Sequence, residues 1–199
     1  APNAAVIAKA RRSFIDEFVP EFLSTYAEIS GGVEQVGLTL TTQVNEDSQA
    51  IESKMLASQD EDRRLRRTTV GVHKDDVVFS LGDHLLKRFG SQGQQKSFLV
   101  ALRLAQLSFI ESATGVKPIL LLDDIFDKID EKRVEALMKR VTNGTFGQVF
   151  ITDTHLGRIP DMFAATGADV RVFEVRQGEV VPQTASCLLY TSPSPRDNP

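Results

Sequence analysis

The string ILLLDDIFDKID at residues 119–130 limits the possible folds of this chain more than any other segment. Residues 118–122 form an uninterrupted apolar run that ends at two adjacent acids, Asp123 and Asp124. Such a run is typical of a central strand in a parallel sheet, and parallel sheets belong to α/β folds. Ligands of open α/β sheets bind at the carboxyl ends of the strands. The string therefore predicts an acid pair at a ligand-binding edge, with two turn or capping acids as the alternative.

A second segment, GSQGQQKS at residues 90–97, comes directly before an apolar helical pattern. The first N–H groups of a helix have no acceptor within the helix, and the helix dipole adds positive potential there. Anions bind readily at such a terminus. By itself the segment is weak evidence for an anion site, because Ser91 also suits a simple helix cap beside a glycine turn.

The rest of the chain divides into a helical first part and a β-rich second part. Helical spacing over residues 4–29, interrupted by Pro20, predicts one long helix. After Gly71 short strands alternate with helices, as in an α/β sheet. The helix at 94–111 is apolar enough to be buried on most sides. We expect further helices at 47–67, 131–141 and 160–166, strands at 36–42, 77–81, 118–122 and 148–152, and a hairpin over 170–181 that turns at Gln177-Gly178.

Composition and chain ends narrow the class of protein. The 199 residues are 41% hydrophobic and 25% charged, which is ordinary for a globular chain. No run approaches the ~20 apolar residues of a transmembrane helix, so we expect a cytoplasmic protein without a membrane partner. The chain begins without methionine, as if cut from a longer protein. Residues 187–197, CLLYTSPSPRD, resemble a translated sequencing adapter, so we expect residues 183–199 to be a non-native tail.

A DNA-binding role would have to rest on a local basic patch, because the formal net charge is −4. The densest patch lies near the end of the helix predicted over 47–67, with a lysine close behind. Phosphate backbones attract such a cluster, whereas a solvated helix face paired with the acids at 60–62 is the alternative. The candidate DNA-binding residues are Arg63, Arg64, Arg66, Arg67 and Lys74.

Taken in order, these segments resemble the ABC-type ATPase domain, a P-loop NTPase. GSQGQ resembles its signature sequence, ILLLDD its Walker B strand and DKID its D-loop, and His155, in ITDTH, falls at its switch histidine. More narrowly, GVHKDD at 71–76, ALRLAQ at 101–106 and DDIFDKID resemble the RecF family of DNA replication and repair ATPases, which is related to the SMC proteins.

The resemblance implies a role for each matching residue. Asp123 would bind Mg²⁺, Asp124 would act as the general base or orient the attacking water, and His155 would contact the γ-phosphate of ATP in the same subunit. The signature residues would contact ATP held by the opposite subunit, and Asp130 would report across that interface. The signature residues concerned are Ser91, Gln92, Gly93 and Gln94.

The resemblance also implies an architecture and a function. Residues 1–70 would be the end of a helical second lobe, and 71–182 the C-terminal half of an ABC ATPase lobe with a mostly parallel sheet. ATP binding would close a homodimer onto double-stranded or gapped DNA, and hydrolysis would release it. RecO and RecR would be partners in DNA repair, replication and the SOS response.

Three departures and three alternatives stay open. Gln92 stands where the ABC signature LSGGQ has its first glycine, Gly90 stands where it has leucine, and Asp124 stands where transporter ATPases have glutamate. No G-x-x-x-x-G-K-[ST] loop is present, so we expect it upstream of Ala1 and expect this chain alone not to hydrolyse ATP. The alternatives are an SMC or RecN relative, a transporter ATPase subunit, and a non-catalytic DNA-binding module with a degenerate nucleotide site.

Overall fold

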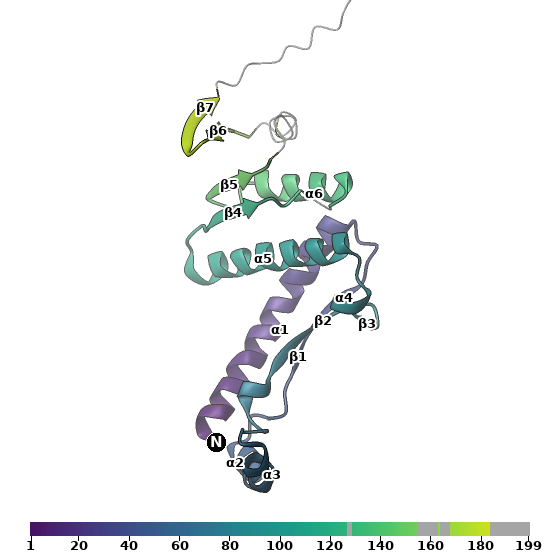
Figure 1. Ribbon diagram of the computed structural model, residues 1–199, viewed down its shortest axis with the longest axis vertical. Coiled ribbons are helices and arrows are strands. Elements are labelled where there is room, and N and C mark those ends of the chain that lie inside the picture. The colour runs from purple at the N-terminus through teal and green to yellow at the C-terminus, as the bar shows by residue number, and fades with distance from the viewer. Residues whose placement is uncertain (127–128, 155–162, 164–167, 184–199) are drawn as a thin grey trace, which may run out of the picture. The chain divides into compact units, whose positions relative to one another are not determined.

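The computed structural model describes residues 1–126, 129–154, 163 and 168–183 (Figure 1). The chain divides into two compact units, Ala1–Thr154 and His155–Pro199. Residues on both sides of the boundary predicted near residue 70 pack within the first unit, and the two-lobe division stays a prediction. Within the described residues, no helix combines the length and the apolar character needed to span a membrane.

Helix α1 (Pro2–Ser30) forms as predicted and contains Pro20. It ends at Gly31, whose φ of 74° is a left-handed conformation that glycine adopts without a Cβ clash. Aromatic side chains recur every four residues along one face, so they form a continuous stripe on one side of the helix. The stripe consists of Phe14, Phe18, Phe22 and Tyr26.

Helix α5 (Gln92–Thr114) packs against this aromatic stripe. The ring centroid of Phe98 lies 4.7 Å from that of Phe22, and Phe109 meets Phe14 edge-on at 5.3 Å. The prediction that this helix is buried on most sides is confirmed, because its exposed side chains between residues 94 and 111 form one narrow stripe, that of Leu99, Arg103, Gln106 and Ile110. Its fully buried side chains lie on the other side, and α1 covers part of that surface.

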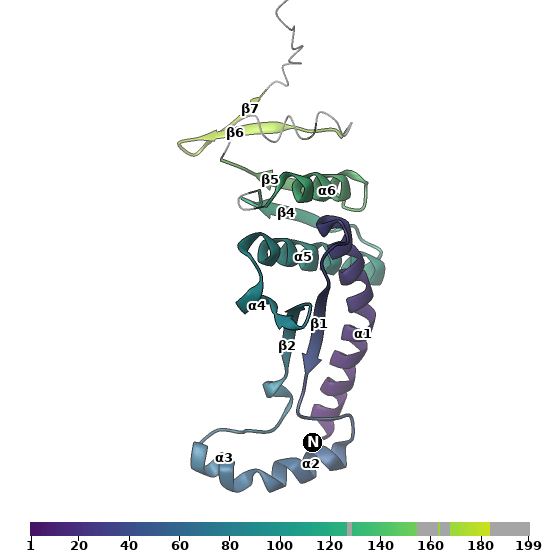
Figure 2. The same ribbon diagram turned by 90° about the vertical axis from the view of Figure 1, so that its right-hand side faces the viewer.

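Strands β1 (Val36–Thr41), β2 (Asp76–Leu81) and β3 (His84–Leu85) form an antiparallel sheet beside α1 (Figure 2). The register pairs Val36 with Leu81 and Thr41 with Asp76. A 3₁₀ turn, η1 (Val72–Lys74), precedes β2, and the short helix α4 (Leu86–Phe89) follows β3. This sheet brings the chain from α1 to the start of α5.

The single helix predicted over residues 47–67 is two helices, α2 (Ser48–Ala57) and α3 (Gln59–Leu65). Asp47 caps α2, because its side chain accepts a hydrogen bond from the Gln49 N–H at 2.9 Å. The break falls at Ser58, whose hydroxyl donates to the Met55 carbonyl at 3.0 Å. Serine favours such local backbone bonds over a continuous helix, which accounts for the break.

Strands β4 (Ile119–Asp123) and β5 (Gln148–Thr152) are parallel, with Asp123 opposite Thr152. Helix α6 (Glu131–Thr142) connects them, so the predicted α/β class is confirmed. Within the described residues β4 pairs with β5 alone, and so the central position predicted for β4 is not observed. One face of this pair exposes large apolar side chains, those of Ile119, Leu121 and Phe150.

The second unit contains the predicted hairpin, formed by β6 (Val172–Arg176) and β7 (Glu179–Gln183). Gln177 and Gly178 make the turn, with φ values of 49° and 86°. Positive φ at both positions matches the right-handed twist of the paired strands. His155, all but one residue of the helix predicted over 160–166, and residues 184–199 of the predicted tail lie outside the described residues.

Candidate functional site

The two acids of the ILLLDD string lie at the carboxyl end of the parallel pair. Asp123 is the last residue of β4, and Thr152 faces it from the end of β5. The Thr152 hydroxyl donates to the Asp123 carboxylate and accepts the Asp124 N–H at 3.3 Å. Both acids are exposed. One threonine hydroxyl therefore orients the first carboxylate and the backbone of the second.

Asp124 has a left-handed backbone, with a φ of 46°. Aspartate tolerates this conformation better than most residues, but it still needs support from its surroundings. Lys96, on the first turns of α5, supplies that support by donating from Nζ to the Asp124 carbonyl at 2.8 Å. The peptide groups on both sides of Asp124 are thus held by different elements, β5 and α5.

The acid pair has the oxygen donors that Mg²⁺ prefers. Magnesium in nucleotide sites is usually held by one or two carboxylates, with phosphate oxygens and water completing an octahedron. Within the described part of the chain, no group of three or more His, Cys, Asp or Glu residues could hold a metal ion by itself. The pair therefore fits a magnesium ion that arrives with phosphate, and fits a closed protein site poorly.

The start of α5 is a capping box built by two signature residues. The Ser91 hydroxyl accepts the Gln94 N–H at 3.2 Å, and the Gln94 side chain accepts the Ser91 N–H at 2.8 Å. These bonds satisfy two of the donors that a helix start leaves free. The intervening N–H groups, of Gln92 and Gly93, are not used by the box and belong to the first turn, which has no internal acceptors. Ser91 and Gln92 are exposed.

Gly90 departs from the leucine of the ABC signature for a steric reason. A Cβ atom at this position would lie 2.8 Å from the Leu86 carbonyl oxygen and 2.9 Å from Leu86 Cδ1. Its φ of −71° is open to any residue, so space rather than backbone conformation excludes a side chain here. The first residue of α4, Leu86, therefore leaves no room for the leucine of the signature at this position.

A half-buried ionic cluster that the sequence did not indicate connects the predicted signature and D-loop residues. Glu34, in the loop before β1, accepts hydrogen bonds from Gln94 Nε2 at 2.7 Å and Arg133 Nη2 at 2.8 Å. Tyr26 of α1 donates its hydroxyl to the other carboxylate oxygen at 2.5 Å. Arg133 Nε also pairs with Asp130, the N-cap of α6, at 2.9 Å.

Burial and pairing act in opposite directions on the groups of this cluster. Burial alone would raise the pKa of Glu34, but hydrogen bonds from Arg133, Tyr26 and Gln94 outweigh it and hold that pKa below its usual value. Burial and then the neighbouring carboxylate raise the pKa of the Tyr26 hydroxyl. Glu34 is therefore ionised and Tyr26 neutral at neutral pH, as the donor directions require.

The structure thus joins several of the predicted site residues and leaves others apart. Ser91 and Gln94 connect to Asp130 through Glu34 and Arg133, and Lys96 connects the same helix to Asp124. The predicted switch residue, His155, lies outside the described residues. The sequence around Glu34 does not indicate its role, because its partners Gln94 and Arg133 lie 60 and 99 residues away.

The predicted basic patch lies at the other end of the first unit, on and after α3. Arg63 and Arg64 form weak contacts with Asp60 and Glu61, at 3.4 and 3.7 Å. Asp62 does not neutralise the patch, because it accepts both the N–H and the hydroxyl of Thr69. Arg66 and Arg67 form no ion pair with the described residues, and all four arginines and Lys74 are exposed.

The GVHKDD segment fastens the start of β2 to α1. Arg11 donates to the Val72 carbonyl at 2.5 Å and to the Asp75 carboxylate at 2.6 Å. The Asp75 side chain is 3% exposed, so this ion pair is closed to solvent on one side. The segment therefore has a structural role, because Val72 and Asp75 bind α1 through Arg11, while Lys74 between them is exposed.

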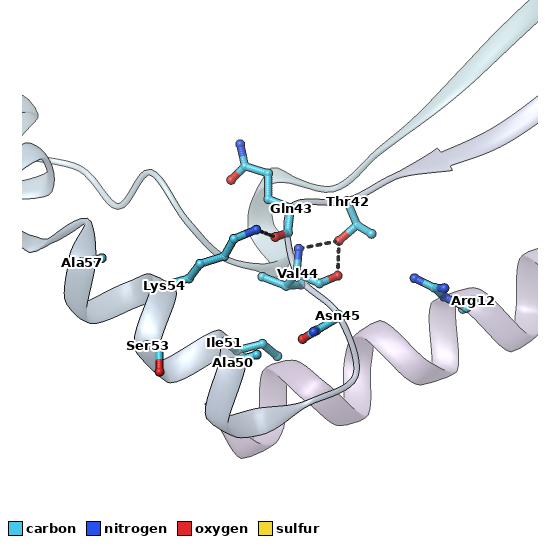
Figure 3. Close-up of a pocket in the computed structure, with 10 residues that line it drawn as sticks. All are labelled: Arg12, Thr42, Gln43, Val44, Asn45, Ala50, Ile51, Ser53, Lys54 and Ala57. Atoms are coloured by element: carbon cyan, nitrogen blue, oxygen red, sulfur yellow. Dashed lines mark hydrogen bonds between the residues drawn. The ribbon is translucent and has the colours of Figure 1, made fainter.

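A cavity lies away from the acid pair and the α5 start. It measures about 670 Å³ and is bordered by α1, α2 and the loop between β1 and α2 (Figure 3). Lys54 crosses its wall to donate to the Gln43 carbonyl at 2.6 Å, and Thr42 and Val44 bond to each other. None of the predicted site residues lines it.

Comparison with known proteins gives a consistent set of relatives. No protein-family model matches the chain. The "DNA replication and repair protein RecF" of Parabacteroides distasonis is 42% identical over 177 residues, 89% of this chain and 48% of the relative. RecF of Flavobacterium johnsoniae is 43% identical over 169 residues, and RecF of Bacteroides thetaiotaomicron 42% over 179. The chain spans about half the length of the curated relatives it matches.

Solved structures show the same likeness. A structure described as the recombination mediator protein RecF-ATP in the RecFOR pathway superposes with a TM-score of 0.72 at 25% identity, over 92% of this chain and 49% of that one. A second, with RecF-ATPrS, has a TM-score of 0.68 at 24% identity and supports the fold alone. All of these matches cover most of this chain and about half of the relative.

Proposed function

Since the chain belongs to the RecF family of DNA replication and repair proteins, we propose that it supplies one half of a cytoplasmic DNA-binding ATPase. The relatives with this name match most of this chain. The complete machine would bind ATP, close as a homodimer on DNA and open again after hydrolysis.

One observation carries the nucleotide part of the proposal, namely the acid pair held at the carboxyl edge of the parallel strands by Thr152 and Lys96. At this edge Asp123 would hold Mg²⁺, which neutralises charge on the transferred phosphoryl group. Asp124, fixed in a left-handed conformation, would orient the attacking water. His155 would contact the γ-phosphate in the same subunit. The RecF structure described with ATP supports a nucleotide at such a site.

The exposed start of α5 would face the partner subunit in the closed dimer. Ser91 and the Gln92 and Gly93 amides offer hydrogen-bond donors at a helix N-terminus, which suits the γ-phosphate of the partner's ATP. Gln94 would hold this geometry through the capping box. Asp130, which caps α6, would lie at the same interface as the D-loop acid.

DNA would meet the basic patch of α3. The arginines are exposed and only weakly paired, so they are available to phosphate groups. Contacts of this kind carry little sequence information, as suits a protein that acts on double-stranded or gapped DNA of any sequence. RecO and RecR would be its protein partners, in keeping with the RecFOR pathway named for the solved relative.

A chimera tests the proposal, joining this chain to the half of Parabacteroides distasonis RecF that it does not match. We expect ATP hydrolysis that Asp124→Asn lowers about 100-fold or more, while ATP binding persists, because this acid acts on the attacking water. The matched control is Asp60→Asn, the same change at a side chain that is 99% exposed on α3. Equal rates for the chimera and its Asp124→Asn variant would contradict the proposal.

A further inference from the structure

We propose that Glu34 is a positioning residue that sets the geometry of the α5 start and of the α6 start together. It thereby connects the helical first part of the chain to both surfaces that would face the nucleotide of the partner subunit. The effect of Glu34 on nucleotide-dependent dimerisation rests on the proposed function. Its structural core, that one carboxylate holds both helix starts, stands on the contacts alone.

Glu34 lies where three elements meet and uses both of its carboxylate oxygens. One oxygen accepts from Gln94 of α5 at 2.7 Å and from Arg133 of α6 at 2.8 Å. The other accepts the hydroxyl of Tyr26, which is fully buried in α1. A single side chain from the loop after α1 therefore contacts α1, α5 and α6.

Each of the two polar contacts continues to a helix start. The Gln94 amide group that donates to Glu34 has its oxygen on the Ser91 N–H at 2.8 Å, which fixes the amide orientation. Arg133 continues from Glu34 to the Asp130 carboxylate at 2.9 Å. Ser91 and Asp130 are thus each two hydrogen-bonded steps from the same carboxylate.

The cluster has little tolerance for the loss of this carboxylate. The side chains of Glu34 and Arg133 are only 16% and 15% exposed, so each charge depends on the other. Arg133 Nη1 is already buried without a hydrogen-bond partner within the described residues. If the Glu34 charge is removed, Asp130 is the one carboxylate left beside Arg133 within the described residues, and both helix starts must adjust.

A second arginine of α6 provides a comparison within the same pair of helices. Arg140 pairs with Glu21 at 3.1 Å and Glu28 at 2.9 Å, and its side chain is 17% exposed. It joins α6 to α1 with similar burial, but within the described residues no hydrogen bond or ion pair links its partners to α5 or to Asp130. Arg140 is therefore a matched control for a purely structural contribution.

The first experiment measures amide hydrogen exchange in the whole chain as it stands. We expect Glu34→Gln to speed exchange of the Ser91 amide about tenfold. The variant weakens the hydrogen bond that holds the Gln94 side chain on the Ser91 N–H, and hydrogen bonds to charged groups stabilise a structure enough for a change of this size. Arg140→Gln should leave this amide unchanged while it lowers the overall stability of the chain. Equal protection of Ser91 in the two variants would overturn the inference without any reference to ATP.

The second experiment uses the chimera described above and measures ATP-dependent dimerisation by sedimentation. Glu34→Gln should weaken dimerisation about tenfold or more with ATP affinity unchanged, whereas Arg140→Gln should not.

The outcomes separate the two proposals. A chimera that neither dimerises nor hydrolyses ATP with Glu34 intact would contradict the proposed function, and hydrogen exchange would still decide whether Glu34 holds Ser91. A working chimera in which Glu34→Gln behaves like Arg140→Gln would overturn the role of Glu34 alone.

Discussion

Thr152 performs two functions at the acid pair with one hydroxyl, since it donates to the Asp123 carboxylate and accepts the Asp124 N–H. A side chain in this position does not touch the substrate of the proposed reaction. It acts by orienting a group that does, and residues of this kind commonly affect metal affinity or activity 10- to 100-fold.

Thr152→Val is therefore expected to separate activity from stability. In the chimera, ATP hydrolysis should fall about 10- to 100-fold. The free energy of unfolding of the chain should fall by only about 0.5–1.5 kcal/mol, because water replaces the lost hydrogen bonds at this exposed edge. Thr152→Ser keeps the hydroxyl and should restore most of the hydrolysis. A large loss of stability with unchanged hydrolysis would contradict the orienting role.

Local strings were enough to predict Asp123, Asp124, Ser91 and Gln94 as candidates, because each stands at the edge of a pattern that reports its own secondary structure. Glu34 follows two glycines in a loop, with no pattern around it. Its importance comes from two partners that only the folded chain brings near, and this kind of residue cannot be found from one sequence by spacing.

At the scale of elements, the junction of α4 and α5 is the tightest part of the candidate site. Gly90 has no room for a methyl group, because the nearest obstacle is the backbone oxygen of Leu86 at 2.8 Å. A backbone atom cannot rotate aside as a side chain can. The start of α5, with its capping box, depends on this close approach.

Gly90→Ala is expected to lower the free energy of unfolding by about 1–3 kcal/mol, because overpacking displaces α4 from α5. Gly37→Ala is the matched control, since its added methyl would meet only the Ser80 hydroxyl, which can rotate away. Urea titration of both variants measures the difference. A cost at Gly37 equal to or above that at Gly90 would contradict the steric explanation.

Most elements matched their predicted ranges, because hydrophobic periodicity and turn residues are local signals. The break between α2 and α3 was not predicted, since the charged surface of these helices has no apolar stripe whose interruption would mark it. The burial of α5 on most sides was predicted, because apolar residues occupy most of its circumference.

At the scale of the whole molecule, the outer face of the β4–β5 pair is the most apolar surface near the candidate site. Leu121 is 71% exposed there, and Ile119 and Phe150 lie on the same face at 60% and 50%. Exposed apolar groups this close together favour association with another surface. In the chimera, the added half of the relative supplies a candidate for that surface.

Leu121→Thr is therefore expected to affect self-association in this chain alone and stability in the chimera. In this chain alone it should reduce self-association, measured by light scattering, with little change in stability. In the chimera it should lower the free energy of unfolding by about 1–3 kcal/mol if the added half covers the face. Leu122→Thr, on the buried face at 6% exposure, should destabilise both. A Leu121→Thr chimera as stable as its parent would show that this face stays uncovered.

Helix α1 connects the region of the basic patch to the cluster around Glu34. Its N-terminal end packs against α2 through Ala8 and Ile51, near the basic patch, and its C-terminal end places Tyr26 on Glu34. The helix rises about 27 Å between Ala8 and Tyr26, so a tilt of about 3° at one of these residues moves the other by about 1.4 Å. A ligand that moves α2 and α3 and thereby tilts α1 would thus lengthen the hydrogen bonds of Glu34 beyond bonding distance. Binding at the basic patch would in this way change the starts of α5 and α6.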